Sequence, residues 1–299
     1  MKKKLVGILS ILMFFIVILN GCAEIDVDED AVDEDDVDTT IVLQVCASGE
    51  KEFTSIQDAI DAALQNSTIF VFPGLYEEQL MINKTITLRG EHSETTIIDG
   101  KNLGRVIEIT HGGFCTITGF TIQKSGSNVA GIELRTSNND IRNNIIKDMY
   151  VGINIAGASY NIIEKNTFIS NAMYGIYISS RSDHNSIKNN LFDDNLYGMR
   201  IKGSRFNLVE KNNFYNNRQG LYFCCGARDN SAFKNNFVNN SVYPILDDAG
   251  GNVLYNDKTN QGNYYDDYIE NHPVAQQFNG IWDTPYDIIG RGNNQDSYP

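Results

Sequence analysis

Two glutamates and a lysine occupy equivalent places in a repeated segment, and carboxylates at such a spacing could act as an acid and a base. Glu164, Lys188 and Glu210 each stand three residues after a recurring asparagine. If the repeats stack about 4.8 Å apart, the two candidate catalytic glutamates lie roughly 9.6 Å apart, near the upper limit for inverting glycosidases. A ladder of ion pairs explains the same alternation without any reaction, and we favour it. The whole column reads Arg142, Glu164, Lys188, Glu210 and Phe233.

A second column of equivalent positions could bind sugar. Its members each follow the glycine of a repeat by two residues, and we expect them to face outward because neighbours such as Ile176 and Ile178 face inward. Aromatic rings would stack on sugar faces while polar groups bond hydroxyls. An ordinary solvated sheet face is the alternative, since tyrosine is common in strands. The substrate-binding column predicted in this way is Glu133, Asn154, Tyr177, Arg200 and Tyr222.

Both columns depend on a repeat that fills the middle of the chain. Segments with apolar residues at alternate positions start at a glycine every 21 to 23 residues, a pattern typical of short strands. One segment cannot bury its own apolar side, whereas stacked segments share a continuous core. The repeat predicts an all-β, right-handed parallel β-helix, a solenoid with about 22 residues per coil and roughly nine or ten coils. Glycine before each strand would permit the turn there.

Asparagine recurs at a fixed place in each repeat. In a parallel stack, equivalent asparagines lie one strand spacing apart, so each amide can bond those above and below it. Asparagine also tolerates the bent backbone of a corner. We expect this column to begin at residue 144, because the preceding coil has Phe120 at that place. The predicted structural ladder is Asn144, Asn166, Asn190, Asn212 and Asn235.

Other elements must close the two ends of the β-helix. Residues 54–57, Thr-Ser-Ile-Gln, read as a capping box that begins a short N-terminal capping helix. A tyrosine-rich, irregular C-terminal cap should fold over the last coil and cover its edge. The helix would bury Ile56, Ala59, Ile60, Ala63 and Leu64. Less regular early strands are expected at residues 69–72, 80–82, 85–88, 96–98, 105–109 and 116–122.

The first forty residues read as an export signal and a tether. Lysines at residues 2–4 precede an apolar run shorter than the ~20 residues of a membrane span. The run ends in Leu-Asn-Gly-Cys, which resembles the lipobox of prokaryotic lipoproteins and makes Cys22 the lipid attachment site; an uncleaved membrane anchor is the alternative. Ten acidic residues within 24–38 predict an extended tether, or else a calcium-collecting segment. The expected division is 1–21 signal peptide, 22–40 acidic tether, 41–261 β-helix and 262–299 C-terminal cap.

Charge and the scarcity of metal-binding residues narrow the function classes. A net charge of −14 argues against a nucleic-acid binder, which needs a basic face. No column stacks carboxylates on adjacent coils, and the four histidines are scattered along the chain, so no metal site, copper least of all, is expected. The pairing of Cys46, Cys115, Cys224 and Cys225 is left open, although a Cys46–Cys115 disulfide would suit an oxidising exterior.

Segments outside the regular repeats resemble a known family. Residues 70–76, Phe-Val-Phe-Pro-Gly-Leu-Tyr, and 96–100, Thr-Ile-Ile-Asp-Gly, are similar to the opening of carbohydrate-associated β-helix proteins. Together with the repeats, Gly-Asn-Tyr-Tyr-Asp-Asp-Tyr at 262–268 and Trp-Asp-Thr-Pro-Tyr at 282–286 resemble the NosD-type family of exported β-helices. Relatives often have a calcium-loop-like acidic stretch before the Asp-Thr-Pro-Tyr segment, whereas residues 271–279 contain no carboxylate.

These features favour a non-catalytic protein of the cell surface or periplasm, held to the membrane only by lipid. Its outward sheet face would bind polysaccharide or other envelope components. A polysaccharide lyase or glycoside hydrolase is one alternative. The family resemblance implies another, an accessory protein of an exported metalloenzyme or transporter. No cofactor is expected, with calcium as the alternative and copper disfavoured.

Overall fold

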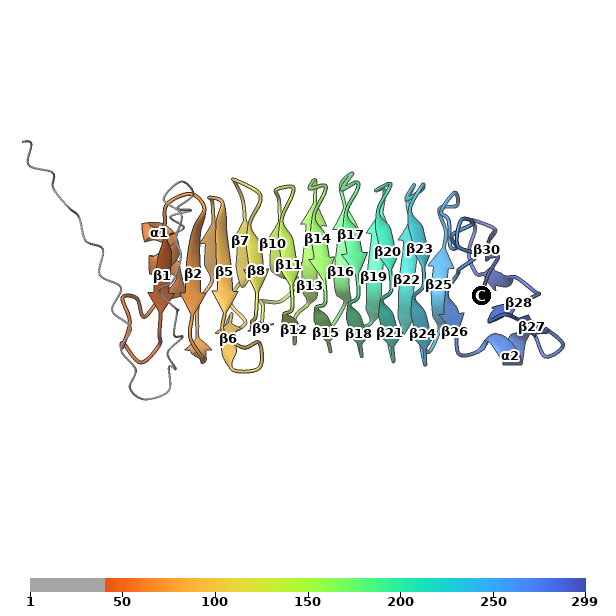
Figure 1. The fold of residues 1–299 in the computed structure, drawn as a ribbon, viewed down its shortest axis with the longest axis horizontal. Coiled ribbons are helices and arrows are strands. Elements are labelled where there is room, and N and C mark those ends of the chain that lie inside the picture. The colour runs from red at the N-terminus through yellow and green to blue at the C-terminus, as the bar shows by residue number, and fades with distance from the viewer. Residues whose placement is uncertain (1–40) are drawn as a thin grey trace, which may run out of the picture. The chain divides into compact units, whose positions relative to one another are not determined.

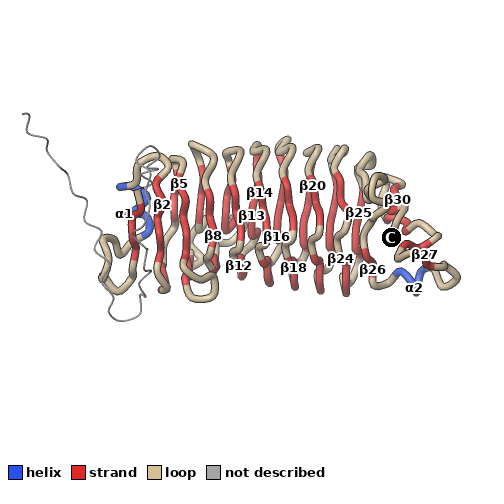
Figure 2. The backbone as a smooth tube through the Cα atoms, in the orientation of Figure 1, coloured by secondary structure: helices blue, strands red, loops and turns tan. Residues whose placement is uncertain are grey.

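A computed structural model describes residues 41–299, so the expected signal peptide, Cys22 and the acidic tether lie outside the described residues. Residues 41–299 wind into a right-handed parallel β-helix whose coils follow one another in chain order along one axis (Figure 1). Short strands alternate with turns around every coil (Figure 2). Three parallel sheets, here named A, B and C, contain nine, nine and eight strands. The predicted fold is confirmed.

Sheet A buries one face and exposes the other. Its inward residues include Ile69, Leu88 and Ile141, none of which has exposed surface, because side chains alternate between the two faces of a strand. The charged column stands on the outward face, in register from strand to strand. In stacking order the strands are β1 (Val42–Val45), β2 (Ser67–Val71), β5 (Ile86–Gly90), β8 (Thr116–Thr118), β11 (Asp140–Arg142), β14 (Ile162–Glu164), β17 (Ser186–Lys188), β20 (Leu208–Glu210) and β23 (Ser231–Phe233).

Sheet B contributes a stack of aromatic rings to the core. Phe168, Phe192, Phe214 and Phe237 are fully buried, and their successive ring centroids lie 4.6–4.8 Å apart. The stack ends on Tyr265, 5.6 Å beyond Phe237. The strands are β3 (Gly74–Tyr76), β6 (Thr96–Asp99), β9 (Thr121–Gln123), β12 (Ile145–Lys147), β15 (Thr167–Ile169), β18 (Leu191–Asp193), β21 (Asn213–Tyr215), β24 (Asn236–Val238) and β26 (Tyr264–Tyr265).

Sheet C contains the repeat glycines, and these serve packing rather than the expected turn. A Cβ at Gly175 would lie 2.7 Å from the ring of Phe192, and one at Gly198 would lie 2.6 Å from Phe214. Neither glycine has a positive φ angle, so the missing side chain makes room for the aromatic stack. The strands are β4 (Leu80–Ile82), β7 (Ile107–Ile109), β10 (Ala130–Leu134), β13 (Val151–Ala156), β16 (Tyr174–Ser179), β19 (Tyr197–Lys202), β22 (Gln219–Cys224) and β25 (Tyr243–Asp247).

The recurring asparagines form a buried hydrogen-bonded ladder between sheets A and B. The backbone N–H and the side-chain amide of Asn166 both donate to Oδ1 of Asn190, at 2.9 and 3.2 Å. The side-chain amide of Asn190 also donates to the carbonyl of Ile163 at 2.8 Å. The residue before each asparagine, such as Lys165 with φ of 55°, has the left-handed backbone that was expected of the asparagine itself. The corner therefore takes two residues, one for the bend and one for its hydrogen bonds.

The ladder begins at Asn144, as predicted, and extends beyond the five predicted asparagines at its C-terminal end. Asn144 accepts from the backbone N–H of Phe120 at 3.1 Å, which makes it the first member. After Asn235 the next member is Asn263, whose amide donates to the carboxylate of Asp296 at 2.9 Å. Two parallel ladders run at the other corners. Their members are Asn139, Asn161, Asn185, Asn207, Asn230 and Asn252 in one, and Asn171, Asn195, Asn217 and Asn240 in the other.

A short helix, α1 (Ile56–Ala62), lies at the N-terminal end of the coil beside β1 (Figure 1). The predicted capping box is wrong: the N-cap is Ser55, whose side chain accepts from the N–H of Asp58. Gln57 does not reach back to the cap; Oε1 of its side chain accepts from the N–H of Met81. Ile56, Ala59 and Ile60 are buried as expected. Leu64 is 63% exposed because the helix ends two residues before it.

The chain closes the C-terminal end of the coil with irregular structure. Tyr286 stacks on Tyr265 with a centroid distance of 3.8 Å, which prolongs the aromatic stack into the cap. Ile289 forms an isolated bridge to Leu246 on the last strand of sheet C and so covers its edge. The elements are α2 (Tyr268–Asn271), β27 (Gln277–Phe278), β28 (Ile281–Trp282), β29 (Tyr286–Ile288) and β30 (Asn294–Asp296).

The four cysteines of the described part of the chain are free thiols. The Cys46–Cys115 disulfide considered from the sequence does not form: Cys46 contacts Ser48, and Cys115 donates to the carbonyl of Lys84. Among residues 41–299, neither α1 nor α2 has the length and apolar character needed to cross a bilayer.

Candidate functional site

The outward face of sheet C brings the predicted binding column side by side. Glu133, Asn154, Tyr177, Arg200 and Tyr222 are direct partners on successive strands from β10 to β22. Strand register alone therefore aligns them at one strand spacing, about 4.8 Å. The column has an acidic end, at Glu133, and an aromatic end, at Tyr222. The two ends differ in how many hydrogen bonds and ion pairs their side chains make with other residues of the protein.

Arg200 is the centre of the aromatic end. Its guanidinium lies over the rings of Tyr177 and Tyr222, 5.8 and 5.0 Å from the centroids, a cation–π arrangement. It donates to the hydroxyl of Tyr174 at 2.7 Å and to Sγ of Cys224 at 3.2 and 3.3 Å. Burial opposes its charge, but these hydrogen bonds raise the pKa of Arg200 further above its usual value. No carboxylate of residues 41–299 lies within ion-pair distance of it.

Two tyrosines that the sequence pattern did not single out complete this end. Tyr174 and Tyr197 are register partners with ring centroids 5.2 Å apart, and Tyr174 also stacks on Tyr177 at 5.0 Å. Each directly precedes a repeat glycine, and this recurring Tyr-Gly pair is the signal that could have found them. The tyrosine–arginine cluster is defined as Tyr174, Tyr177, Tyr197, Arg200 and Tyr222.

The rings of this cluster do not offer the open faces expected of a sugar-stacking strip. Arg200 lies over Tyr177 and Tyr222, while Tyr174 and Tyr197 stack against them. The hydroxyls of Tyr174 and Tyr222 are hydrogen bonded to Arg200 and Asp248. Those of Tyr177 and Tyr197 have no hydrogen-bond partner among residues 41–299. The cluster thus presents hydroxyl groups and a cationic centre to a ligand rather than bare aromatic faces.

The acidic end is already neutralised by its neighbours. Glu133 is only 4% exposed, because Arg105 and Asn154 bond its carboxylate at 3.2 and 3.0 Å and Arg135 lies 3.7 Å away. Arg135 also pairs with Glu108 at 2.9 Å. Glu133, predicted to contact a ligand, is thus already held by protein groups. Oδ1 of Asn154 is buried without a hydrogen-bond partner.

The candidate catalytic glutamates lie on sheet A, a different face from the cluster. Glu210 pairs with Lys188 at 3.4 Å and with Lys234 at 3.7 Å. Glu164 instead accepts a hydrogen bond from the side chain of Asn189. Arg142 pairs with Asp140 on its own strand rather than with Glu164. The ion-pair ladder is thus formed at Glu210 and interrupted at Glu164.

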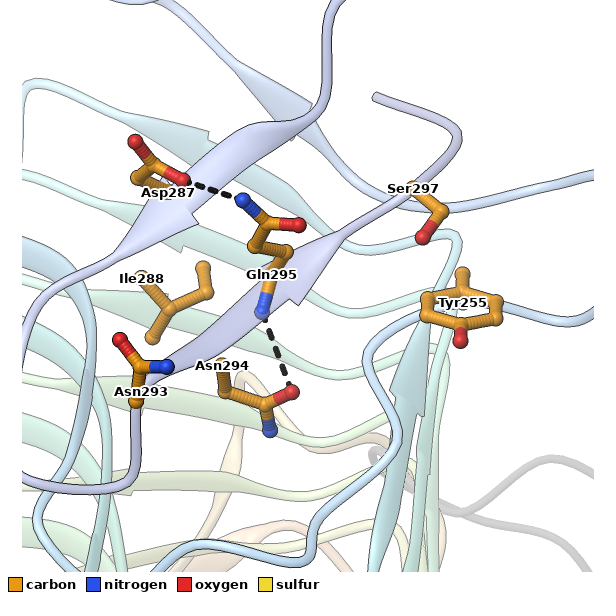
Figure 3. A pocket seen from close by; sticks show the side chains of 7 residues that line it. All are labelled: Tyr255, Asp287, Ile288, Asn293, Asn294, Gln295 and Ser297. Atoms are coloured by element: carbon orange, nitrogen blue, oxygen red, sulfur yellow. Dashed lines mark hydrogen bonds between the residues drawn. The ribbon is translucent and has the colours of Figure 1, made fainter.

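Two of the hollows on the described surface differ in their position relative to the predicted column. One of about 530 Å³ lies in the C-terminal cap, where Gln295 donates to Asp287 and the hollow is bordered by Tyr255 and Ser297 (Figure 3). The other, about 300 Å³, adjoins the tyrosine–arginine cluster and is lined by residues that include Tyr177 and Cys225. Of these two hollows, the second is the one lined by a residue of the predicted column, Tyr177.

Comparison with known protein families shows to which family this chain belongs. The model of a family described as periplasmic copper-binding protein (NosD) matches residues 60–269, from within α1 to α2. The chain belongs to the NosD family. The resemblance to the NosD family is confirmed.

Individual proteins resemble this NosD chain in sequence or in fold. A cell surface glycoprotein of Methanothermus fervidus is 30% identical over 161 residues, which cover 43% of this chain and 27% of that protein; the chain thus spans about a quarter of that relative. Carrot pectin methylesterase has a TM-score of 0.52 at 9% identity and covers 70% of this chain and 82% of its own. The complex of XylC with xylose has a TM-score of 0.60 at 12% identity, covering 71% and 66%. These two structures show the shared fold.

The histidine, cysteine and carboxylate side chains of residues 41–299 form no cluster suited to a copper centre. Copper sites gather histidine, cysteine or methionine ligands, but no group of three or more His, Cys, Asp or Glu side chains within residues 41–299 is placed to hold a metal ion. His184 is stacked between Tyr160 and Phe206. His272 lies far from His184 in the chain and packs on Tyr268.

Substitution of Glu210 by glutamine tests the catalytic alternative for this NosD chain. Because its pairs with Lys188 and Lys234 lie near the surface, we expect a loss of less than about 1 kcal/mol in the free energy of unfolding. We expect no effect on reducing-end or unsaturated-product formation from polygalacturonate. Glu164→Gln is the matched variant. Turnover by the native protein that either variant abolishes would show that these carboxylates are catalytic.

Proposed function

We propose that the protein is an exported, lipid-anchored β-helix that binds polysaccharide through the tyrosine–arginine cluster without cleaving it. The observation that carries the proposal is the pair of unpartnered hydroxyls, on Tyr177 and Tyr197, beside the guanidinium of Arg200, which has no carboxylate partner. Hydroxyls donate to and accept from sugar hydroxyls, and a guanidinium binds ring substituents and carboxylates.

The regular spacing of the cluster suits a polymer rather than a single sugar. Strands β16, β19 and β22 place Tyr177, Arg200 and Tyr222 at successive steps of about 4.8 Å. A periodic ligand laid across the strands would meet a polar group on each one. The hollow beside Tyr177 and Cys225 gives this otherwise flat face a place for a protruding substituent.

Export and anchoring rest on other observations. The family description names a periplasmic protein, and the Methanothermus fervidus relative is named a cell surface glycoprotein. The Leu-Asn-Gly-Cys motif supports lipid attachment at Cys22, with the acidic residues 22–40 as a tether between lipid and β-helix. In this arrangement residues 41–261 form the binding body and residues 262–299 its cap.

The double substitution Tyr177→Ala/Tyr222→Ala is expected to weaken polysaccharide binding about tenfold or more, because it removes both rings from the guanidinium of Arg200 and one free hydroxyl. Binding is measured by affinity electrophoresis with polygalacturonate and with xylan, probes chosen from the named neighbours. A glycan array extends the search.

The matched control is Tyr215→Ala, on strand β21 of sheet B and half-buried. Its binding should equal that of the native protein. The double variant Tyr177→Phe/Tyr197→Phe keeps the rings and removes the two free hydroxyls. We expect it to show much of the loss of binding that the alanine variant shows. Equal binding by the native protein and the Tyr177→Ala/Tyr222→Ala variant, with unchanged circular dichroism, would remove the cluster as the binding site.

A further inference from the structure

Two adjacent cysteines lie at the end of strand β22 with their sulfur atoms close together. Cys224 is the last residue of the strand, and Cys225 follows in a left-handed conformation with φ of 59°. Neighbouring side chains of a regular strand point to opposite faces. Here the turn at Cys225 and Gly226 redirects the second side chain, and the two Sγ atoms lie 3.2 Å apart.

The two thiols differ in surroundings. Cys225 is exposed and lines the hollow next to Tyr177. Cys224 is 2% exposed, and its sulfur accepts two hydrogen bonds from the guanidinium of Arg200, at 3.2 and 3.3 Å. One thiol is therefore open to a reagent in solution, while the other is buried beside a positive charge that stabilises a thiolate.

We propose that Cys224 and Cys225 are a redox pair that low-molecular-weight disulfides oxidise to a bond between neighbouring residues. The thiolate of Cys225 attacks the reagent disulfide, forms a mixed disulfide and releases one reagent thiolate. The thiolate of Cys224 then attacks Sγ of Cys225, forms the Cys224–Cys225 bond and releases the second reagent thiolate. The two cysteines lose two electrons and two protons, and the reagent disulfide takes them up as two thiols.

Arg200 favours the second step. The pKa of Cys224 is raised overall, chiefly by burial and also by the neighbouring thiol of Cys225, while the hydrogen bonds and the charge of Arg200 lower it. Once Cys225 is in the mixed disulfide, it no longer donates to Cys224 and no longer raises the pKa of that thiol. Burial is then the one raising effect that Arg200 has to offset. The attacking thiolate thus forms beside the guanidinium that stabilises it.

The geometry makes the bond labile rather than structural. Adjacent Cα atoms are about 3.8 Å apart, below the roughly 4.4–6.8 Å that an unstrained disulfide spans. Strained and exposed disulfides are reduced more readily than structural ones. The pair is therefore suited to reversible oxidation outside the cell.

A regulatory consequence rests on the proposed function. Arg200 joins Cys224 to Tyr174, Tyr177 and Tyr222, so a change at Cys224 reaches the cluster directly. Oxidation removes a hydrogen-bond acceptor from Arg200 and leaves the guanidinium freer to bond a ligand. The redox chemistry itself is measured without any ligand, so its failure is distinguishable from failure of polysaccharide binding.

The test treats the folded protein with oxidised glutathione, then denatures it in iodoacetamide and maps peptides by mass spectrometry. The tryptic peptide of residues 219–228 contains both cysteines. We expect it to lack alkylation and to have lost two hydrogens, and dithiothreitol should reverse this. Cys46 and Cys115, both buried, should be alkylated in the same sample and serve as internal controls.

Variants make the result specific. Cys225→Ser should leave Cys224 alkylated, whereas Cys115→Ser should still form the bond. Arg200→Gln should slow closure of the mixed disulfide by about tenfold. Two alkylated cysteines in the 219–228 peptide, a lasting glutathione adduct on Cys225, or a bridge between two protein chains would each overturn the proposal.

Discussion

Alanine at position 190 is expected to lower the free energy of unfolding of the β-helix by about 3 kcal/mol. Asn190 has no exposed surface. Its side chain accepts from the backbone N–H of Asn166 at 2.9 Å and donates to the carbonyl of Ile163 at 2.8 Å. Alanine leaves that N–H without an acceptor and that carbonyl without one of its donors inside the coil. Each lost partner of a buried group costs roughly 1–3 kcal/mol.

Guanidinium denaturation followed by circular dichroism measures this loss. The matched control is Asn213→Ala on strand β21, where the side chain faces outward and accepts only from Asn236. That control should lose less than about 1 kcal/mol. A similar loss in both variants would mean that the ladder contributes no more than any other asparagine.

Raising the pH from about 4 to about 6 is expected to cost the protein about 2 kcal/mol of stability through Asp296. Asp296 has no exposed surface and ends the asparagine ladder. Its Oδ2 accepts from the N–H and the side-chain amide of Asn263, at 2.7 and 2.9 Å, and from the hydroxyl of Tyr265 at 3.1 Å. Burial nevertheless dominates and raises the pKa of Asp296 to about 6.

The sign follows from proton binding in the two states. The native state holds the proton of Asp296 more tightly than the unfolded state, whose pKa is 3.8. Stability from this group is therefore fully present below the unfolded pKa and is lost as the pH rises through the folded value. Asp99 acts in the opposite direction: burial raises its pKa, but bonds from Lys124, Gln123 and the backbone N–H of Lys101 outweigh it and lower the pKa overall. A variant is needed to isolate the contribution of Asp296.

Asp296→Asn supplies that comparison. Asparagine keeps an acceptor for Asn263 and cannot ionise, although it loses the acceptor for the N–H of Tyr298. The stability of the native protein minus that of the variant, from denaturation curves at pH 4 to 7, should fall by about 2 kcal/mol across the window. Asp287→Asn, an exposed carboxyl on β29, should show no such fall. A stability difference between the native protein and Asp296→Asn that does not change with pH would contradict a raised pKa for Asp296.

The regular coils could be predicted from the sequence because each repeats the same local choices. Strand register, the inward isoleucines and the position of Asn144 as first member of its ladder follow from spacing alone. The termini were harder, since no repeat constrains them. The N-cap moved from Thr54 to Ser55 because Glu78, on a later segment, accepts from the N–H groups of Ile56 and Gln57. Strand β1 had no periodic neighbour to indicate it.

The sequence predicted which residues of the candidate site lie in one line, but it did not predict which of their side chains touch. Register placed Tyr177, Arg200 and Tyr222 in one line, but it could not show that the guanidinium would lie over both rings. Tyr174 stood outside the chosen column, although it bonds Arg200. The partners of Glu133 could not be read from the column, because Arg105 reaches it from the preceding coil and Arg135 from just after β10.

By itself the sequence determined the winding of the chain and which residues share a column, because both follow from a repeat length and an in–out alternation that act within one coil. Only the tertiary structure decided which side chains of a column contact one another and which groups those contacts engage. Arg200 is the centre of the tyrosine–arginine cluster and a partner of Cys224 because its long side chain reaches tyrosines and a thiol on neighbouring coils. Such contacts depend on rotamers that several coils choose together, and no single repeat carries that information.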